Sequence, residues 1–234
     1  MPDPFQRVLV VLAHPDDPEF FCGATLAKWA RAGKEIHYLL LTCGDKGSDS
    51  PDVTPEMICA DRQSEQRAAA AIIGAREVTF LHYRDGELAN TREVQRDIVR
   101  AIRRIKPNIV VTCDPTLLFR PNHTGINHPD HRAAGAATLD AIFPAAGNRM
   151  YFAELLDEGL EPHSPQEVWL SGTNEPNIWV NVNETLEIKL AALRAHRSQI
   201  KDPVALEKRI RERMRRTEIA EEFYAEGFRV IRLT

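Results

Sequence analysis

Short, continuously apolar segments rich in β-branched residues recur along the 234-residue chain, and segments with helical spacing separate them. The first, residues 7–13 (RVLVVLA), has no polar face, which is typical of a parallel strand buried on both sides. The alternation predicts an α/β fold, Rossmann-like, with an open, mostly parallel sheet and helices on both faces. Further strands are predicted at residues 36–42, 78–81, 108–113, 150–155, 168–171, 178–182 and 228–233, and helices at 19–32, 54–73, 91–106, 129–142, 184–199 and 206–224.

Residues 1–234 are expected to form a single domain, because no repeat, low-complexity tract or linker interrupts the pattern. A chain of this length buries roughly 70% of its unfolded surface, so its core can be stable without a structural metal ion. If the chain binds a metal, we therefore expect a catalytic rather than a structural role for it. The formal charge of −4 argues against a nucleic-acid or anionic-membrane partner. The basic run 208–216 is interleaved with glutamates, which favours a solvated helix or a contact in a homo-oligomer.

The cysteines and the amino end bear on the compartment. The four cysteines form no C-x-x-C pair and lie among apolar neighbours, which favours small core residues over ligands or disulfides (Cys22, Cys43, Cys59, Cys113). The first residues lack the apolar stretch of a signal peptide, and no segment approaches the ~20 apolar residues of a membrane helix. We therefore expect a cytoplasmic protein without a membrane partner.

The loop after the first strand carries an unusual cluster of ionisable side chains. A dinucleotide-binding or phosphate-binding loop would be rich in glycine there, but this chain has His14, Asp16 and Asp17. Carboxylates so close together repel one another unless a cation or hydrogen bonds compensate them. A metal ion is one interpretation; the other is that both aspartates simply cap the following helix.

A second cluster follows the fourth apolar strand and a long loop. His128 and His131 stand three residues apart, and Pro129 fits the first position of a helix, which would place both imidazoles on nearly the same side. Asp130 lies between them, where it could orient an imidazole. Taken alone, the pair could equally be surface histidines that cap a helix.

The two clusters together favour a metal site. Loops that follow parallel strands meet at one edge of a doubly wound sheet, so we expect both clusters in one crevice. A site of histidine, aspartate and histidine leaves an open coordination position, which suits catalytic zinc; iron, cobalt or nickel could occupy the same geometry. A neighbouring carboxylate and a histidine for proton transfer would equip the site to hydrolyse an amide.

The segment 13–17 (AHPDD) together with 128–131 (HPDH) resembles the LmbE-like, or PIG-L, family of zinc-dependent N-acetylglucosamine deacetylases. The resemblance also covers Arg62 and Glu65, residues 85–88 (DGEL) and residues 196–199 (HRSQ). It implies an LmbE-like fold, a cofactor of one Zn²⁺ per chain and a small N-acetyl sugar or conjugate as the substrate.

The resemblance also implies a role for individual residues. His14, Asp17 and His131 would bind zinc, and Asp16 would be the general base. His128 would be the general acid or support the oxyanion, and Asp130 would hold His128 in its charged orientation. Arg62 would contact sugar hydroxyls or an anionic aglycone.

Some positions depart from the family pattern or have no assigned role. Members that act on mycothiol precursors have a tyrosine where this chain has Ile126, so support for the oxyanion must come from elsewhere. The roles of Glu19, His123 and His196 are open. Two alternatives to sugar deacetylation remain: an amidase for another N-acyl metabolite or thiol conjugate, and a sugar-binding protein without turnover.

Overall fold

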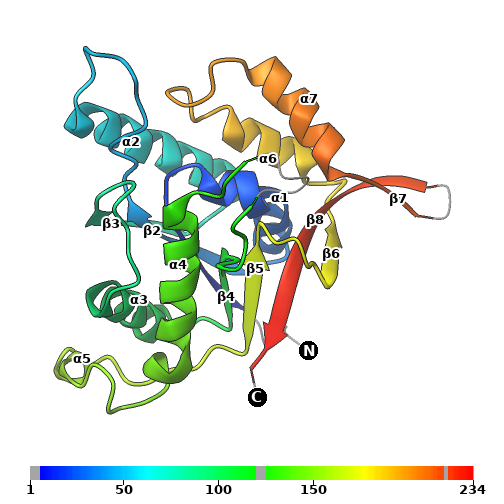
Figure 1. Cartoon of the computed structure of the whole chain (residues 1–234). Helices are drawn as coiled ribbons and strands as arrows, with labels where there is room; N and C mark the ends of the chain where they lie inside the picture. Colours follow the sequence, from blue (N-terminus) through cyan, green and yellow to red (C-terminus); the bar gives the residue numbers. More distant parts are fainter. Residues whose placement is uncertain (1–5, 120–124, 219–220, 234) are drawn as a thin grey trace.

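The computed structural model describes residues 6–119, 125–218 and 221–233 (Figure 1). Its core is a mixed, mostly parallel sheet with strands in the order β3-β2-β1-β4-β5-β8-β6, and β7 pairs with β8 outside this path. The strands are β1 (Arg7–Leu12), β2 (Glu35–Thr42), β3 (Glu77–Tyr83), β4 (Ile109–Cys113), β5 (Glu167–Ser171), β6 (Ile178–Asn181), β7 (Arg215–Glu218) and β8 (Glu221–Arg232). The predicted fold class is confirmed.

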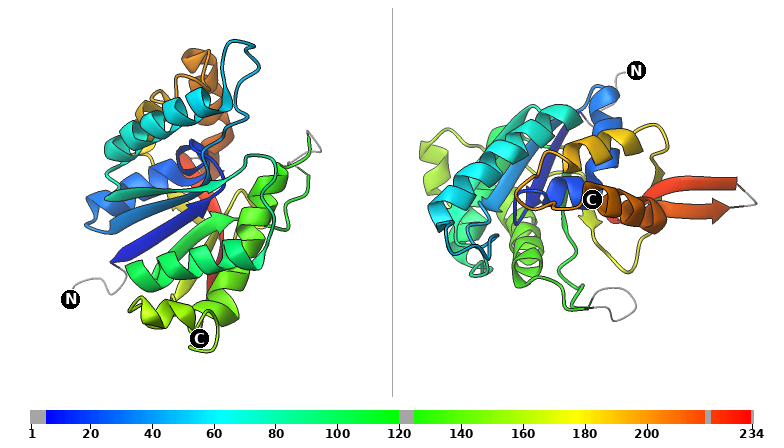
Figure 2. Two further views of the ribbon diagram at one scale, coloured as in Figure 1. Left: turned by 90° about the vertical axis from the view of Figure 1, so that its left-hand side faces the viewer. Right: turned by 90° about the horizontal axis from the view of Figure 1, so that it is seen from above.

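Helices cover both faces of the sheet (Figure 2). One face carries α1 (Asp17–Arg31), α2 (Pro55–Ile73) and α6 (Leu186–Leu193), while the other carries α3 (Arg92–Ile105), α4 (Pro129–Asp140) and the π-helical segment η2 (Ala141–Ala146). The short α5 (Glu154–Asp157) follows η2, and α7 (Pro203–Met214) packs beside α6. Within the described residues, none of these helices is both long and apolar enough to cross a membrane.

The alternation of side chains along β1 explains why this strand is apolar throughout. Val8, Val10 and Leu12 belong to the core under α1 and α2, whereas Leu9 and Val11 belong to the core under α3 and α4. Parallel pairing with β2 on one side and β4 on the other leaves β1 no solvent-exposed edge. The strand is therefore buried on both faces, as its sequence predicts.

Two predicted elements are wrong. The strand expected at residues 150–155 is a turn that leads into α5, and two of its carbonyls, those of Tyr151 and Phe152, accept from the buried guanidinium of Arg103 rather than from a neighbouring strand. The helix expected at 206–224 ends at Met214, and the chain continues into the β7–β8 hairpin. There β8 inserts antiparallel between β5 and β6, so pairing with distant strands overrides the local helical pattern.

The cysteine prediction is half right. Cys22 and Cys113 are free, buried core residues, but Cys43 and Cys59 form a disulfide. The bond joins the loop after β2 to the first half of α2, two segments whose proximity the sequence spacing does not reveal. It weakens the cysteine argument for a reducing compartment, so the cytoplasmic location stays a prediction.

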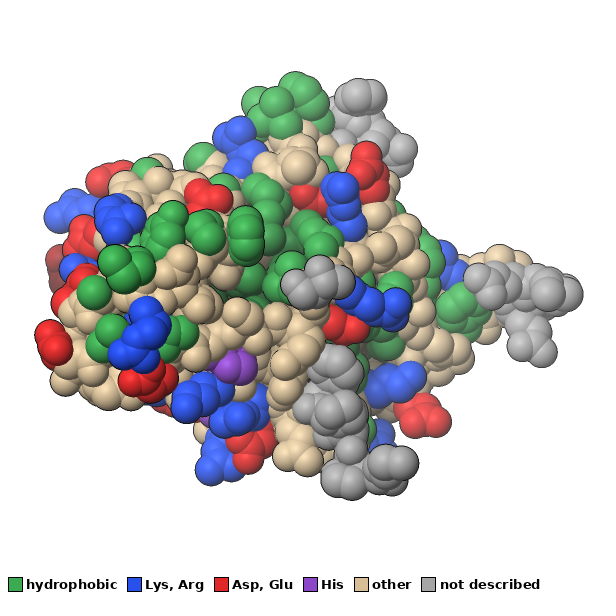
Figure 3. Space-filling view, turned by 90° about the horizontal axis from the view of Figure 1, so that it is seen from below, with side chains coloured by type: hydrophobic (Ala, Val, Ile, Leu, Met, Phe, Trp, Pro, Cys, Tyr) green, Lys and Arg blue, Asp and Glu red, His purple; other side chains and the backbone are tan. Residues whose placement is uncertain are grey.

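On the face seen in Figure 3, lysine and arginine side chains are interspersed with aspartate and glutamate. Hydrophobic side chains lie exposed between them. This mixture accords with the small net charge, while the exclusion of nucleic acid and the homo-oligomer both stay predictions.

Candidate metal centre

The two His/Asp clusters lie at neighbouring strand ends. The first follows β1, and the second begins α4, after β4, which pairs with β1 in parallel. The chain leaves β1 toward β2 and leaves β4 toward β5, so strand order reverses between them. This is the point at which open α/β sheets bind ligands. Pro129 is the first residue of α4, as the sequence predicts.

The three predicted ligands come within reach of a single ion. His131 Nε2 lies 3.1 Å from Asp17 Oδ1, and His14 Nδ1 lies 3.5 Å from Asp17 Oδ2. One ligand atom from each of the three residues lies within 4.8 Å of the others. The structure thus brings together segments more than 100 residues apart.

Each imidazole turns one nitrogen toward Asp17 and the other toward a hydrogen-bond acceptor. His14 Nε2 donates to the carboxylate of Asp130 (3.2 Å), so that Nδ1 can offer a lone pair once a metal ion replaces its proton. His131 Nδ1 donates to Asn127 Oδ1 (3.2 Å), which leaves the lone pair on Nε2. Such hydrogen bonds from the outer nitrogen are the usual support of metal-ligating histidines. The donor set therefore fits a divalent transition metal.

The charges around His14 also call for a cation. Burial lowers the pKa of His14, but the carboxylates of Asp130, Asp17 and Asp85 outweigh burial and raise it to about 12. Burial alone would raise the pKa of Asp17, yet His131 and His14 hold it well below its usual range. A positive charge at this position therefore stabilises the site, and a metal ion can supply it in place of the proton.

Asp16 is the N-cap residue of α1, but its side chain makes no capping hydrogen bond. Its backbone adopts φ 85°, a left-handed conformation that is uncommon for residues other than glycine. Burial raises the pKa of its carboxyl to about 7, although the guanidinium of Arg62 acts in the opposite direction. The capping interpretation therefore fails for Asp16, whose carboxylate has the pKa of a general base poised near neutral pH.

Arg62 does not have the environment expected of a sugar-binding residue. Its side chain is only 6% exposed and donates to the carbonyls of Pro15 (2.7 Å) and Gly44 (3.2 Å). It also lies 3.4 Å from the carboxylate of Asp16. The guanidinium thus joins two loops and lies beside Asp16, while its Nε has no hydrogen-bond partner within the described residues. That Arg62 contacts substrate stays a prediction.

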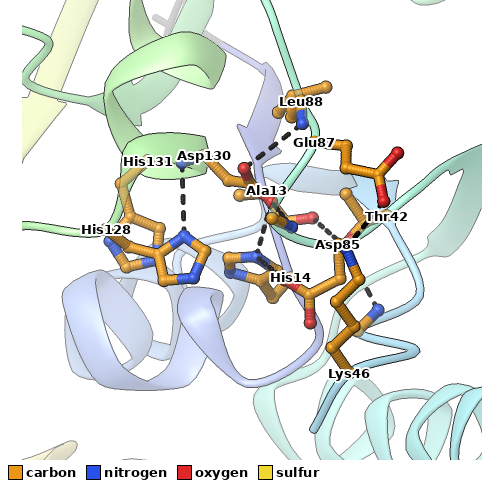
Figure 4. A network of polar contacts seen from close by, with 12 residues as sticks. Ala13, His14, Thr42, Lys46, Asp85, Glu87, Leu88, His128, Asp130 and His131 are labelled. Atoms are coloured by element: carbon orange, nitrogen blue, oxygen red, sulfur yellow. Dashed lines mark hydrogen bonds and ion pairs between the residues drawn. The ribbon is translucent and has the colours of Figure 1, made fainter.

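Asp130 supports a different histidine from the one expected. Its carboxylate accepts from the backbone N–H groups of Gly86 (2.7 Å) and Leu88 (3.3 Å) and from His14 Nε2 (Figure 4). Only its backbone N–H meets His128, by donation to Nδ1 (3.2 Å). A protonated Nδ1 could not accept this bond, and burial and His14 lower the pKa of His128. Asp130 itself raises the pKa of His128, although burial and His14 outweigh this effect. That Asp130 keeps His128 charged stays a prediction.

The sequence interpretation missed two residues of the site. Asp85, in the loop after β3, places Oδ1 3.1 Å from His14 Nε2 and forms a second group of potential ligands with His14 and His128. Asn127 orients His131. An acid directly after a strand end, and an amide directly before a histidine motif, are the signals that could have found them.

The residues with no assigned role divide into three cases. Glu19 and His196 are fully buried and contact each other (3.0 Å). Ile126 is 67% exposed, beside the second histidine motif. His123 lies outside the described residues.

Comparisons with known proteins agree with this geometry. Residues 9–142 match the family model PIG-L, described as GlcNAc-PI de-N-acetylase. The diacetylchitobiose deacetylase of Thermococcus kodakarensis is 36% identical over 85% of this chain and 72% of that protein. A probable N-acetyl-α-D-glucosaminyl L-malate deacetylase of Bacillus anthracis is 28% identical over 87% and 86%. The solved N,N'-diacetylchitobiose deacetylase of Pyrococcus horikoshii superposes with TM-score 0.85 at 29% identity, covering 97% of this chain and 84% of that one.

Proposed function

Because the chain belongs to the PIG-L family of GlcNAc-PI de-N-acetylases, we propose that it hydrolyses the acetamide of an N-acetylated amino sugar. The observation that carries this proposal is the arrangement of His14 Nδ1 and His131 Nε2 around Asp17, with the uncapped carboxylate of Asp16 next to them in the chain. Substrates named for the relatives make a saccharide containing N-acetylglucosamine the first class to test, with diacetylchitobiose as its simplest member.

We assign the metal to His14, Asp17 and His131, with zinc as the ion that their nitrogen and oxygen donors and the open position suit best. An ion bound there would polarise the acyl oxygen and make a bound water more acidic. Asp130 and Asn127 keep the two imidazoles in the tautomers that coordination needs.

The remaining side chains move protons and stabilise charge. Asp16 takes the proton of the attacking water and, once protonated, can pass it to the departing amine. Arg62 holds the Asp16 carboxylate through an ion pair at 3.4 Å. Because His128 accepts at Nδ1, its proton sits on Nε2, from which it can donate a hydrogen bond to the oxygen of the tetrahedral intermediate. His128 thus acts as a neutral donor.

The test is acetate release from a panel of N-acetylglucosamine saccharides and conjugates, by metal-depleted protein and by protein reloaded with zinc. Asp16→Asn should keep the bound zinc and lose about 10²–10⁴ in rate, because only the base is removed. His131→Ala should lose the zinc as well. If acetate comes only from other N-acyl compounds, the substrate class is wrong; saccharide binding without turnover would identify a binding protein and refute the hydrolase.

A further inference from the structure

We infer that three buried side chains, Gln66, Glu19 and His196, form a relay that positions the general base Asp16 for the proposed hydrolysis. We call them the Gln66 relay. All three are fully buried, and none belongs to the candidate metal ligands. The inference rests on the proposed function, because it assumes that Asp16 is the base.

The relay begins at the backbone of Asp16. The left-handed conformation at φ 85° costs energy for a residue with a Cβ and persists only where surrounding contacts enforce it. Here the N–H of Asp16 donates to Gln66 Oε1 at 2.7 Å. This bond fixes the turn in which the side chain of Asp16 leaves its capping position, so the direction of the carboxylate depends on Gln66.

The Gln66 amide in turn contacts the carboxylate of Glu19. Gln66 Nε2 lies 3.1 and 3.0 Å from the two carboxylate oxygens of Glu19. The backbone N–H of Asp16 can only donate, so the amide oxygen of Gln66 must face Asp16 and its NH₂ group must face the oxygens of Glu19. A flipped amide would set an N–H group against the N–H of Asp16.

The third member, His196, anchors Glu19 from the turn after α6. His196 Nε2 lies 3.0 Å from Glu19 Oε2. The same turn is hydrogen-bonded to α2, because Ser198 donates to Glu65 from both its backbone N–H (2.8 Å) and its hydroxyl (2.7 Å). Since α2 carries Gln66 and also Arg62, the turn secures the helix that holds Asp16 by both its backbone and its carboxylate.

The chemistry of the relay favours positioning over simple core filling. A fully buried carboxylate is costly, and apolar side chains of similar volume commonly stabilise a core as well or better. The hydrogen bonds of Glu19, however, lead through one amide to the backbone of the base. A misplacement of about 1 Å at a reacting group can lower the rate about 10²-fold, which is reason enough to retain such a chain of polar groups.

The experiment measures kcat, KM, bound zinc and thermal unfolding for Gln66→Met, His196→Leu and His196→Gln. Gln66→Met should lower kcat about 10–100-fold, because the base is displaced, while KM and bound zinc stay at the wild-type values. His196→Leu should lower kcat in the same way. His196→Gln should restore it, because the glutamine amide can donate to Glu19 from the position of Nε2.

Arg103→Met is the matched control for lost stability. Arg103 is fully buried, and within the described residues its guanidinium donates to backbone carbonyls of residues 145–152, on the other face of the sheet. The Arg103→Met variant should have a lower melting temperature than the wild-type protein and the same kcat. Wild-type kcat in Gln66→Met, or no difference between His196→Leu and His196→Gln, would overturn the inference while the hydrolase stands. A wild-type protein that releases no acetate would refute the proposed function and this inference together.

Discussion

Replacing Asp130 by asparagine tests whether this carboxylate supports His14 or His128. The carboxylate is completely buried and has three donors around it: Gly86 N, Leu88 N and His14 Nε2. Asparagine keeps the shape but offers one accepting oxygen where aspartate has two. In either orientation its amide NH₂ group faces at least one of these donors.

The expected loss of stability follows from the number of donors around this carboxylate. One buried donor left without a partner costs about 1–3 kcal/mol, so the metal-free protein should lose about that much stability. Weakening the partner of a metal-ligating histidine lowers metal affinity about 10–100-fold. That loss corresponds to about 1.4–2.8 kcal/mol in binding free energy. Both effects should appear, because the same carboxylate holds the loop after β3 and the ring of His14.

Zinc affinity is measured by titrating metal-depleted protein against a competing chelator, and stability by urea unfolding of the same metal-free samples. Asp140→Asn is the control, because Asp140 ends the same helix and contacts the exposed side chain of Asn90 (2.7 Å) far from the metal ligands. Asp140→Asn should match the wild-type protein in zinc affinity. If Asp130→Asn also keeps wild-type zinc affinity and loses only kcat, Asp130 acts through His128 and our geometric argument is wrong.

Three further predictions concern stability. Cys43→Ser removes a disulfide that closes a separation of 16 residues with Cys59, so unfolding should cost about 3 kcal/mol less; the melting temperature should fall by roughly 6–12 °C, and an effect of reductant on the variant would contradict this assignment. Lys189→Met leaves the buried Glu226 carboxylate without its cation and should lower the free energy of unfolding by about 3–5 kcal/mol, measured in urea. A loss smaller than that of a surface ion pair would contradict this prediction. Burial lowers the pKa of His163 below 6.5, so the contribution of this residue to stability is present above pH 6.5 and disappears as the pH falls. Between about pH 7 and about pH 5 the melting temperature should therefore fall less in His163→Gln than in the wild-type protein. An equal fall in both proteins would refute the assignment.

Most of the parallel half of the sheet could be predicted from the sequence, because each element carries its own periodicity. The apolar run of β1 and the proline that begins α4 are local signals, and both are confirmed. The β7–β8 hairpin could not be predicted, because β8 is a strand only by virtue of its pairing with β5 and β6. Helical spacing in a charged segment says nothing about such partners.

The sequence alone determined the chemistry available at the site: imidazoles and carboxylates placed directly after β1 and at the start of α4, which a parallel sheet must bring to one edge. Only the tertiary structure decided which side chain of the site forms a hydrogen bond or ion pair with which other one. It placed Asp130 on His14, buried Arg62 behind Asp16 and joined Gln66 to Glu19. These pairings connect residues 46 to 116 positions apart, and hydrogen bonds depend on ångström distances and ring orientation. Sequence periodicity determines the face on which a side chain lies but not the atom that it meets.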